Sequence, residues 1–291
     1  MTTIKHLVIT GGGGHAVIKC MAVYQKLISE SFIKLSEIET IWGTSAGSIV
    51  ATLIALKYDW KMINTYIIER PWNKLFNITL DRLFDLYHKK GIFDVEIIEK
   101  SFKPIFDVID IPLDITLEDF HKFSKIEIHF STFEINSFEL CDISYKTHPN
   151  LRLLLAIQMS CGLPIIFTPV CLDNKIFIDG GIKTSYSLDS CIEYGCNPNE
   201  ILGLRNKLHD ENTLAGDDTN LFDYMLHLLV KIIKSVRSIS SNKIKHEIEL
   251  PPFLINLNIL KECSENQELR QQLFDEGIEI ATNYLSTVCK N

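Results

Sequence analysis

A serine flanked by glycines is the feature of this sequence that most directly indicates chemistry. Residues 43–47 read Gly-Thr-Ser-Ala-Gly, so Ser45 is the centre of a G-x-S-x-G motif. Residues 38–42 before it are β-prone, and residues 48–56 after it are apolar and read as a helix. A strand, a sharp turn and a helix in this order lift a serine hydroxyl clear of a sheet and place it at a helix N-terminus. We therefore predict that Ser45 is a nucleophile.

Two further glycine-rich segments follow predicted strands. Residues 6–10 form a strand that ends in four glycines, Gly11 to Gly14, and residues 175–178 form a short strand that runs into Asp179. Backbone N–H groups of the glycine loop can hold a developing oxyanion, because no Cβ atoms block them. Asp179 can accept the proton of the serine. Since ligands bind beyond the carboxyl ends of parallel strands, we expect the three features to converge.

The order of predicted elements is that of an α/β protein. A strand, the glycine loop, a helix over residues 16–29, a second strand and the helix after Ser45 imply parallel strands joined by crossover helices. Residues 57–125 read mainly as helices, and residues 126–133 alternate as a strand that turns into another at 138–145. We expect one domain over residues 1–291, with a catalytic core at 5–205 and a helical C-terminal part at 206–291.

Within the C-terminal part, residues 221–237 read as an amphipathic helix, and a last helix is expected over residues 266–288. We expect the apolar face of the first of these helices to pack against the core. That face consists of Leu221, Met225, Leu228, Leu229, Ile232, Ile233 and Val236.

Composition excludes several classes of function. The chain has 291 residues, is 46% hydrophobic and carries a net charge of −8, so nucleic acid is not an expected partner and an anionic membrane gains little from the overall charge. The N-terminus lacks the layout of a signal peptide, and no apolar run reaches the roughly 18 residues that span a bilayer. Eight cysteines include no C-x-x-C pair. We expect a cytoplasmic protein with no metal and no cofactor.

Two other interpretations of the motifs remain open. Residues 11–16 also fit the dinucleotide pattern G-x-G-x-x-A, but that reading needs an acidic residue at the end of the second strand, where Trp42 stands. A Ser-His-Asp hydrolase would use a histidine after Asp179, and His209, His227 and His246 all follow it. That fold has several strands before its serine, whereas this chain has room for one or two.

In combination, these motifs resemble the patatin-like phospholipase family. The glycine loop, the serine motif and Asp179-Gly180-Gly181 occur in the family's order, and residues 160–170 resemble the family's Pro-x-x-Phe-x-Pro-Val segment. The resemblance covers residues 5–205. It implies a three-layer α/β/α fold with a central, mostly parallel sheet, followed here by C-terminal helices. It also implies a Ser–Asp dyad without histidine or metal.

The implied activity is the hydrolysis of fatty acyl esters of phospholipids or neutral lipids, with transient contact to membrane surfaces. A catalytically silent lipid-binding protein of the same fold is the alternative. The sequence departs from the family at His15 and Ala16, where the family has Arg or Lys and then Gly, and at residues 185–187, where it has Asn-x-Pro. His15 would support the oxyanion only while protonated. The assigned site residues are Ser45 and Asp179 as the catalytic pair, Gly12, Gly13 and Gly14 as the oxyanion hole, and Gly11, Gly43, Gly47, Gly180 and Gly181 as motif glycines.

Overall fold

The computed structural model describes residues 3–207, 216–252 and 257–288. Its strands are β1 (His6–Ile9), β2 (Thr40–Thr44), β3 (Gly91–Phe93), β4 (Glu127–Glu134), β5 (Glu139–Ile143), β6 (Ile165–Phe167), β7 (Val170–Leu172), β8 (Lys175–Asp179), β9 (Ile201–Asn206) and β10 (His246–Leu250). Its α-helices are α1 (Gly13–Ser29), α2 (Ala46–Ala55), α3 (Trp60–Glu69), α4 (Leu80–Lys89), α5 (Val95–Val108), α6 (Leu117–Ser124), α7 (Leu153–Cys161), α8 (Leu188–Glu193), α9 (Leu221–Val236), α10 (Leu257–Glu265) and α11 (Gln267–Val288).

The central sheet is mostly parallel. Its strand order is β10-β9-β1-β2-β4-β8-β7, with β5 paired to β4. The first five strands of this order are parallel, whereas β5, β7 and β8 are antiparallel to their neighbours. A separate pair, β3 and β6, forms a small parallel sheet. The structure confirms the expected mostly parallel sheet.

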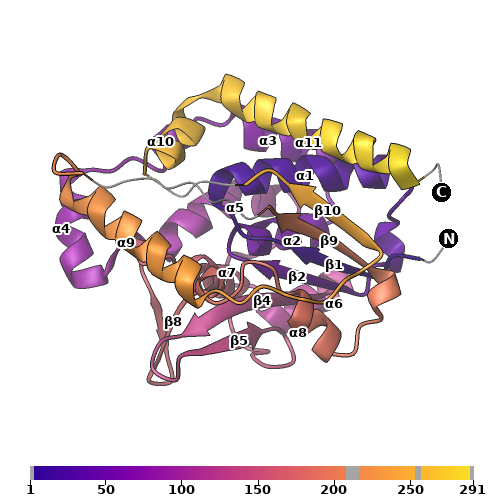
Figure 1. The fold of residues 1–291 in the computed structure, drawn as a ribbon, viewed down its shortest axis with the longest axis horizontal. Helices are drawn as coiled ribbons and strands as arrows, with labels where there is room; N and C mark the ends of the chain where they lie inside the picture. The colour runs from indigo at the N-terminus through magenta and orange to yellow at the C-terminus, as the bar shows by residue number, and fades with distance from the viewer. Residues whose placement is uncertain (1–2, 208–215, 253–256, 289–291) are drawn as a thin grey trace.

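The strands at the centre of the sheet are apolar on both faces, because helices cover both. In β1, Leu7 and Ile9 pack into the main core with α1 and α2, whereas Val8 packs on the other face with Leu188 and Cys191 of α8. This alternation follows from the two-residue period of a strand. Figure 1 shows α1, α3 and α11 above the sheet and α8 below it. The fold is therefore the three-layer arrangement that the sequence predicts.

The C-terminal part adds to the sheet as well as to the helical layers. β10 pairs in parallel with β9, from His246 opposite Leu202 to Leu250 opposite Asn206. α11 lies along α1, and Gly277 permits the close approach, since a Cβ atom there would lie 2.7 Å from the Lys19 carbonyl oxygen. We predicted helices in this part but not β10.

The expected burial of the apolar face of α9 is wrong for more than half of its residues. Leu226 and Ile233 are buried, and Leu229 and Val236 pack partly against the core. The remaining residues of the predicted face, Leu221, Met225, Leu228 and Ile232, are exposed. The helix is apolar over more of its circumference than its packing uses, so hydrophobic spacing alone did not reveal which side faces the core.

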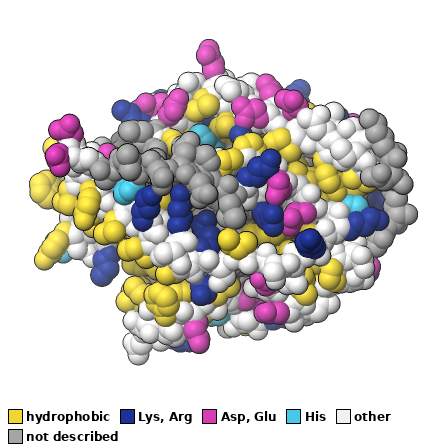
Figure 2. Space-filling view, viewed as in Figure 1, with side chains coloured by type: hydrophobic (Ala, Val, Ile, Leu, Met, Phe, Trp, Pro, Cys, Tyr) yellow, Lys and Arg dark blue, Asp and Glu magenta, His cyan; other side chains and the backbone are white. Residues whose placement is uncertain are grey.

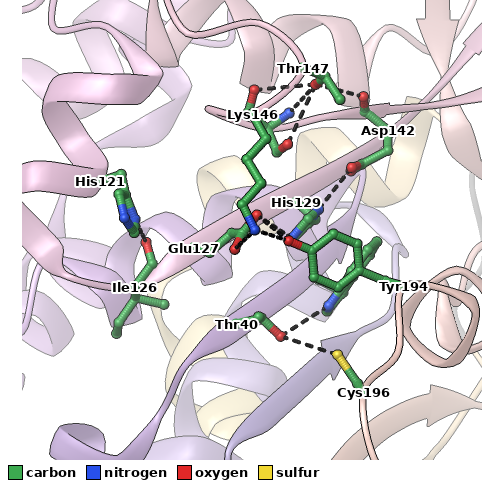
Figure 3. Close-up of polar contacts among 12 residues, drawn as sticks. Thr40, His121, Ile126, Glu127, His129, Asp142, Lys146, Thr147, Tyr194 and Cys196 are labelled. Carbon is green, nitrogen blue, oxygen red and sulfur yellow. Dashed lines mark hydrogen bonds and ion pairs between the residues drawn. The ribbon is translucent and has the colours of Figure 1, made fainter.

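A polar network fastens the lower layer to the sheet (Figure 3). His129 of β4 lies between two carboxylates, with Nδ1 2.8 Å from Asp142 Oδ2 and Nε2 3.2 Å from Glu127 Oε1. Glu127 also accepts a hydrogen bond from the Tyr194 hydroxyl at 2.8 Å and pairs with Lys146 at 2.9 Å. Burial opposes charging of His129, but the two carboxylates raise its pKa. The network lies at the start of β4 and joins the end of α8 to the β4–β5 hairpin.

Candidate active site

Ser45 occupies a strained turn between β2 and α2. Its backbone has φ 53° and ψ −123°, a conformation that non-glycine residues rarely adopt. A Cβ atom at Gly43 would lie 2.5 Å from the Gly47 carbonyl oxygen, and one at Gly47 would lie 2.4 Å from the Ile9 carbonyl oxygen. Both positions therefore require glycine, as the motif predicts. The turn leaves the Ser45 side chain partly exposed at the N-terminus of α2.

The Ser45 hydroxyl donates a hydrogen bond to the Asp179 carboxylate, with 2.6 Å between Oγ and Oδ2. Asp179 is the last residue of β8, and it lies opposite Thr132 of β4 in an antiparallel pair. The expectation that the two side chains converge therefore agrees with the structure, but the argument from parallel strands does not apply to β8. Asp179 reaches the site because β8 returns toward Ser45 from beyond the end of β4.

The Asp179 carboxylate is buried beside the turn that follows it. Its Oδ1 accepts a hydrogen bond from the Gly181 N–H at 2.7 Å. Burial raises the pKa of Asp179 to about 6, against the opposing effects of the Ser45 and Gly181 hydrogen bonds and the charge of Arg237. A Cβ atom at Gly180 would lie 2.4 Å from the Ser131 carbonyl oxygen, so this position also needs glycine. A carboxylate with a pKa near neutrality is suited to accept and return a proton.

Arg237, which the sequence analysis did not single out, supports the loop that carries Asp179. It caps the C-terminus of α9 and donates two hydrogen bonds to the Gly181 carbonyl oxygen, from Nη2 at 2.8 Å and from Nε at 3.2 Å. The next residue, Ser238, donates its N–H to the Lys183 carbonyl at 2.7 Å. The end of α9 is therefore attached to the Asp179 loop.

Ser160 of α7 stabilises the turn at Ser45 by a hydrogen bond to its backbone. Its hydroxyl accepts a hydrogen bond from the Ser45 N–H at 2.9 Å and donates one to the Ser131 carbonyl at 2.8 Å. Ser187, in the segment where the family has Asn-x-Pro, lies within 2.7 Å of Thr44 Oγ1 and 2.6 Å of Ser131 Oγ. Both serines are buried, and they hold the Ser45 N–H and the side chain of the preceding residue, Thr44.

The glycine loop lies beside Ser45. A Cβ atom at Gly11 would lie 3.1 Å from Ser45 Cβ. Gly12 has φ 149° and Gly13 has φ 67°, and both values lie in the region that favours glycine. α1 begins at Gly13 without a side-chain cap, so the first N–H groups of the helix have no partner within it. These groups have the character of an anion-binding helix N-terminus.

His15 lies one residue beyond the last glycine, in the first turn of α1. Its Nε2 is buried, with no hydrogen-bond partner among the described residues. Burial and then the charge of Lys19 lower the pKa of His15, and the charges of Glu262 and Glu276, which raise it, have smaller effects. The imidazole therefore favours its neutral form, which weakens the support for a cationic role. A cavity of about 20 Å³ lies between the glycine loop and α10, and residues of both line it.

Ser45 and Asp179 bond directly, and no histidine of the described ranges stands between them. His246 bonds through Nδ1 with the Tyr284 hydroxyl at 2.8 Å, and His227 lies on α9. His209, the remaining candidate, lies outside the described residues.

Over the described ranges, His, Cys, Asp and Glu side chains form no cluster of three that could hold a metal ion. In the same ranges, no helix is long and apolar enough to cross a membrane.

Known proteins are similar to this chain in sequence or in fold. "Probable lipid hydrolase 463L" of Invertebrate iridescent virus 6 is 31% identical over 193 residues, which cover 65% of this chain and 64% of that protein. "Uncharacterized protein R571" of Acanthamoeba polyphaga mimivirus is 27% identical over 288 residues, 94% of this chain and 91% of that protein. The match to the iridescent virus protein thus spans just under two thirds of its length.

The structure of VipD from Legionella pneumophila has the same fold, with a TM-score of 0.55 at 15% sequence identity over 98% of this chain and 67% of that chain. A sequence profile of patatin-like phospholipases matches residues 7–192, a range that includes the glycine loop, Ser45 and Asp179. This chain therefore belongs to the patatin-like phospholipase family.

Proposed function

We propose that this protein is a serine acyl hydrolase of the lipase or phospholipase A type, which cleaves fatty acyl esters of lipids. The observation that carries the proposal is the 2.6 Å hydrogen bond from Ser45 Oγ to Asp179 Oδ2 at a strained strand-to-helix turn. Membership of the family and the 31% identity to a protein named as a lipid hydrolase support a lipid ester as the substrate class.

In the first half of the reaction, Ser45 Oγ attacks the ester carbonyl carbon while its proton passes to Asp179 Oδ2. The carbonyl oxygen becomes an oxyanion, for which the backbone N–H groups of Gly12, Gly13 and Gly14 are the donors. The bond from the carbonyl carbon to the alcohol oxygen then breaks, and Asp179 returns the proton to the leaving alcohol. The fatty acid remains as an ester on Ser45.

In the second half, water takes the place of the alcohol. Asp179 accepts a proton from the water as it attacks the acyl ester, and the same N–H groups hold the second oxyanion. Ser45 Oγ leaves with the proton from Asp179, and the fatty acid is released. Because the pKa of Asp179 is about 6, the carboxylate is mostly ionised at neutral pH and can begin this cycle.

A fluorophosphonate probe, which labels activated serines, tests the assignment together with hydrolysis of a soluble short-chain ester. Ser45→Ala should abolish labelling and lower kcat/KM by roughly 10³-fold or more, and Asp179→Asn should lose nearly all activity. Ser286→Ala is the matched control, because this exposed serine of α11 bonds only locally, to the Asn283 carbonyl. Labelling of another serine, with Ser45→Ala fully active, would contradict the assignment.

The same assays separate the alternatives. A catalytically silent lipid-binding protein would bind lipid without labelling at Ser45. A Ser-His-Asp hydrolase would lose activity when His209, His227 or His246 is replaced by Gln, to the same degree as when Asp179 is replaced by Asn. We expect each of these three histidine variants to keep most of the wild-type activity.

A further inference from the structure

One side of α9 consists of apolar side chains that no other part of the described chain covers. Leu221, Leu228 and Ile232 follow one another at helical spacing, and they are 69%, 46% and 48% exposed. Large aliphatic side chains scattered singly on a surface are ordinary, but a row along one helix face is not. This row is part of the face that the sequence led us to expect in the core.

α4 carries a second row of the same kind. Leu80, Phe84 and Tyr87 again lie at helical spacing, and they are 73%, 76% and 87% exposed. A phenylalanine and a leucine exposed to this degree lose the free energy that burial would supply, which is about 1.5–3 kcal/mol for each side chain. Within the described residues, two apolar helix faces are therefore exposed.

The two faces lie at the same end of the molecule. On their inner sides, Leu83 and Leu86 of α4 pack into one apolar cluster with Leu226 and Leu229 of α9. Figure 1 shows both helices at the left, and Figure 2 shows hydrophobic side chains gathered there. We call the two outward rows the docking face, formed by Leu80, Phe84, Tyr87, Leu221, Leu228 and Ile232.

The chain that continues from the α9 row of the docking face is basic, although the protein as a whole is acidic. Residues 224–246 include no Asp or Glu but five Lys or Arg, in a protein of net charge −8. The acidic residue of α9, Asp223, lies in its first turn, whereas Lys231 and Lys234 lie in its second half. Figure 2 shows Lys and Arg side chains beside the hydrophobic ones. Exposed apolar residues bordered by lysines are typical of helices that lie at an anionic membrane surface.

We propose that the docking face binds the surface of an anionic phospholipid bilayer, and that α4 and α9 thereby bring the site to its substrate. The inference deepens the proposed function and rests on it. Arg237, at the end of α9, contacts the loop of Asp179, so a bilayer against α9 lies close to the catalytic pair. A second copy of the chain fits this face less well, because a two-fold interface would bring the lysines of both copies, Lys231 and Lys234 of each, into one contact area.

Vesicle sedimentation with Ser45→Ala tests binding without turnover. The inactive protein should bind vesicles of phosphatidylcholine and phosphatidylserine more tightly than vesicles of phosphatidylcholine alone, and added salt should weaken the binding. Phe84→Ser combined with Leu228→Ser should reduce partitioning by about 10-fold or more. The matched control is Val108→Ser combined with Phe123→Ser, which removes exposed apolar side chains from α5 and α6 and should bind as before.

A second variant tests Lys231 and Lys234, the lysines of α9 beside the docking face. Lys231→Gln combined with Lys234→Gln should weaken binding to the anionic vesicles by about 5-fold for each residue, and binding to neutral vesicles should not change. In protein that keeps Ser45, the variant of Phe84 and Leu228 and the variant of Lys231 and Lys234 should both hydrolyse a soluble short-chain ester at the wild-type rate. On anionic vesicles, they should hydrolyse phospholipid more slowly in proportion to the loss of binding.

Two results would overturn the inference. One is unchanged vesicle binding by the Phe84 and Leu228 variant. The other is a wild-type dimer that this variant converts to a monomer while vesicle binding persists, because the face would then serve self-association. Failure of the proposed function looks different, since wild-type protein would bind the vesicles and cleave neither the soluble ester nor the lipid.

Discussion

Arg237 reaches the candidate active site through the backbone of Gly181, two residues after Asp179. Its guanidinium donates two hydrogen bonds to that carbonyl oxygen, while the Gly181 N–H donates to Asp179 Oδ1. One residue therefore links the end of α9 to the loop that holds the Asp179 carboxylate. The charge of Arg237 also lowers the pKa of Asp179, against the larger effect of burial.

The first prediction concerns the pH dependence of hydrolysis. In the proposed mechanism Asp179 must be ionised to accept the proton of Ser45, and burial raises its pKa to about 6. We expect kcat/KM for a soluble ester to fall as the pH decreases through about 6, with a slope of one in the logarithmic plot, and to level off above it. A rate independent of pH across this range, or a midpoint that moves when His227 or His246 is replaced by Gln, would contradict the role of Asp179.

The second prediction concerns Arg237→Gln. Loss of the positive charge removes an effect that lowers the pKa of Asp179, so the acid limb of the pH–rate profile should shift to higher pH. Arg237→Lys keeps the charge but cannot reproduce the pair of hydrogen bonds from Nε and Nη2 to the Gly181 carbonyl. It should therefore shift the acid limb less than Arg237→Gln. The pH profile separates this role from a merely structural one, because a loosened fold lowers the rate at every pH. An unshifted limb in the Gln variant would reject the link.

The third prediction is that Asp179→Asn stabilises the protein at neutral pH while it removes activity. The folded-state pKa of about 6 exceeds the ordinary aspartate value of 3.8, so ionisation of Asp179 disfavours the folded state. This destabilisation is absent below the pKa that Asp179 has in the unfolded state, and it is complete above the pKa that Asp179 has in the folded state. Two pKa units correspond to about 3 kcal/mol.

Thermal unfolding checks this prediction. Asp179→Asn should have a higher Tm than wild type well above the folded pKa, and the difference should shrink as the pH falls from the folded to the unfolded pKa and vanish below it. Ser45→Ala is the control, because it removes the hydroxyl partner but leaves the buried carboxylate. If the Tm of the Asn variant did not exceed that of wild type at the higher pH, the ionised carboxylate would not destabilise the folded state.

Local sequence patterns predicted the parts of the fold that lie next to the chemistry. The strand before Ser45, the helix after it and the glycines on either side follow from a short β-prone run, helical spacing and a turn with no room for Cβ atoms. These features depend on neighbours in the chain, and the backbone angles of Ser45 bear them out. The mostly parallel sheet follows from the same βαβ order.

The parts that the sequence did not predict depend on contacts between distant residues. Ser160 bonds with the Ser45 N–H across 115 residues, and Arg237 bonds with Gly181 across 56. Neither a buried serine near a helix end nor an arginine after an amphipathic helix carries a local signal of such a contact. The direction of β8 and the pairing of β10 with β9 are likewise set by tertiary packing. The exposed side of α9 has the same cause, since spacing identifies an apolar face but not its partner.

The last prediction concerns His15, which stands where the family resemblance implies a permanent cation beside the oxyanion loop. Burial, and then the charge of Lys19, lower the pKa of His15 from its usual value of about 6.5, so the imidazole is neutral at neutral pH. A neutral imidazole adds no positive charge to the oxyanion. We therefore expect no loss of activity as the pH rises through the histidine range, and His15→Gln should keep the shape of the profile and the rate within about 3-fold.

His15→Arg is the complementary variant. It would place the family's cation in a cavity of about 20 Å³, which has room for about one water molecule, so α10 must shift to accept a guanidinium. A charge near the glycine loop should then raise kcat, by less than the roughly 100-fold that a directly bonded oxyanion donor supplies, and without changing the acid limb set by Asp179. The measurement is kcat across the pH range for wild type, His15→Gln and His15→Arg. A wild-type rate that falls with rising pH, and that the arginine restores, would show instead that His15 acts as a cation.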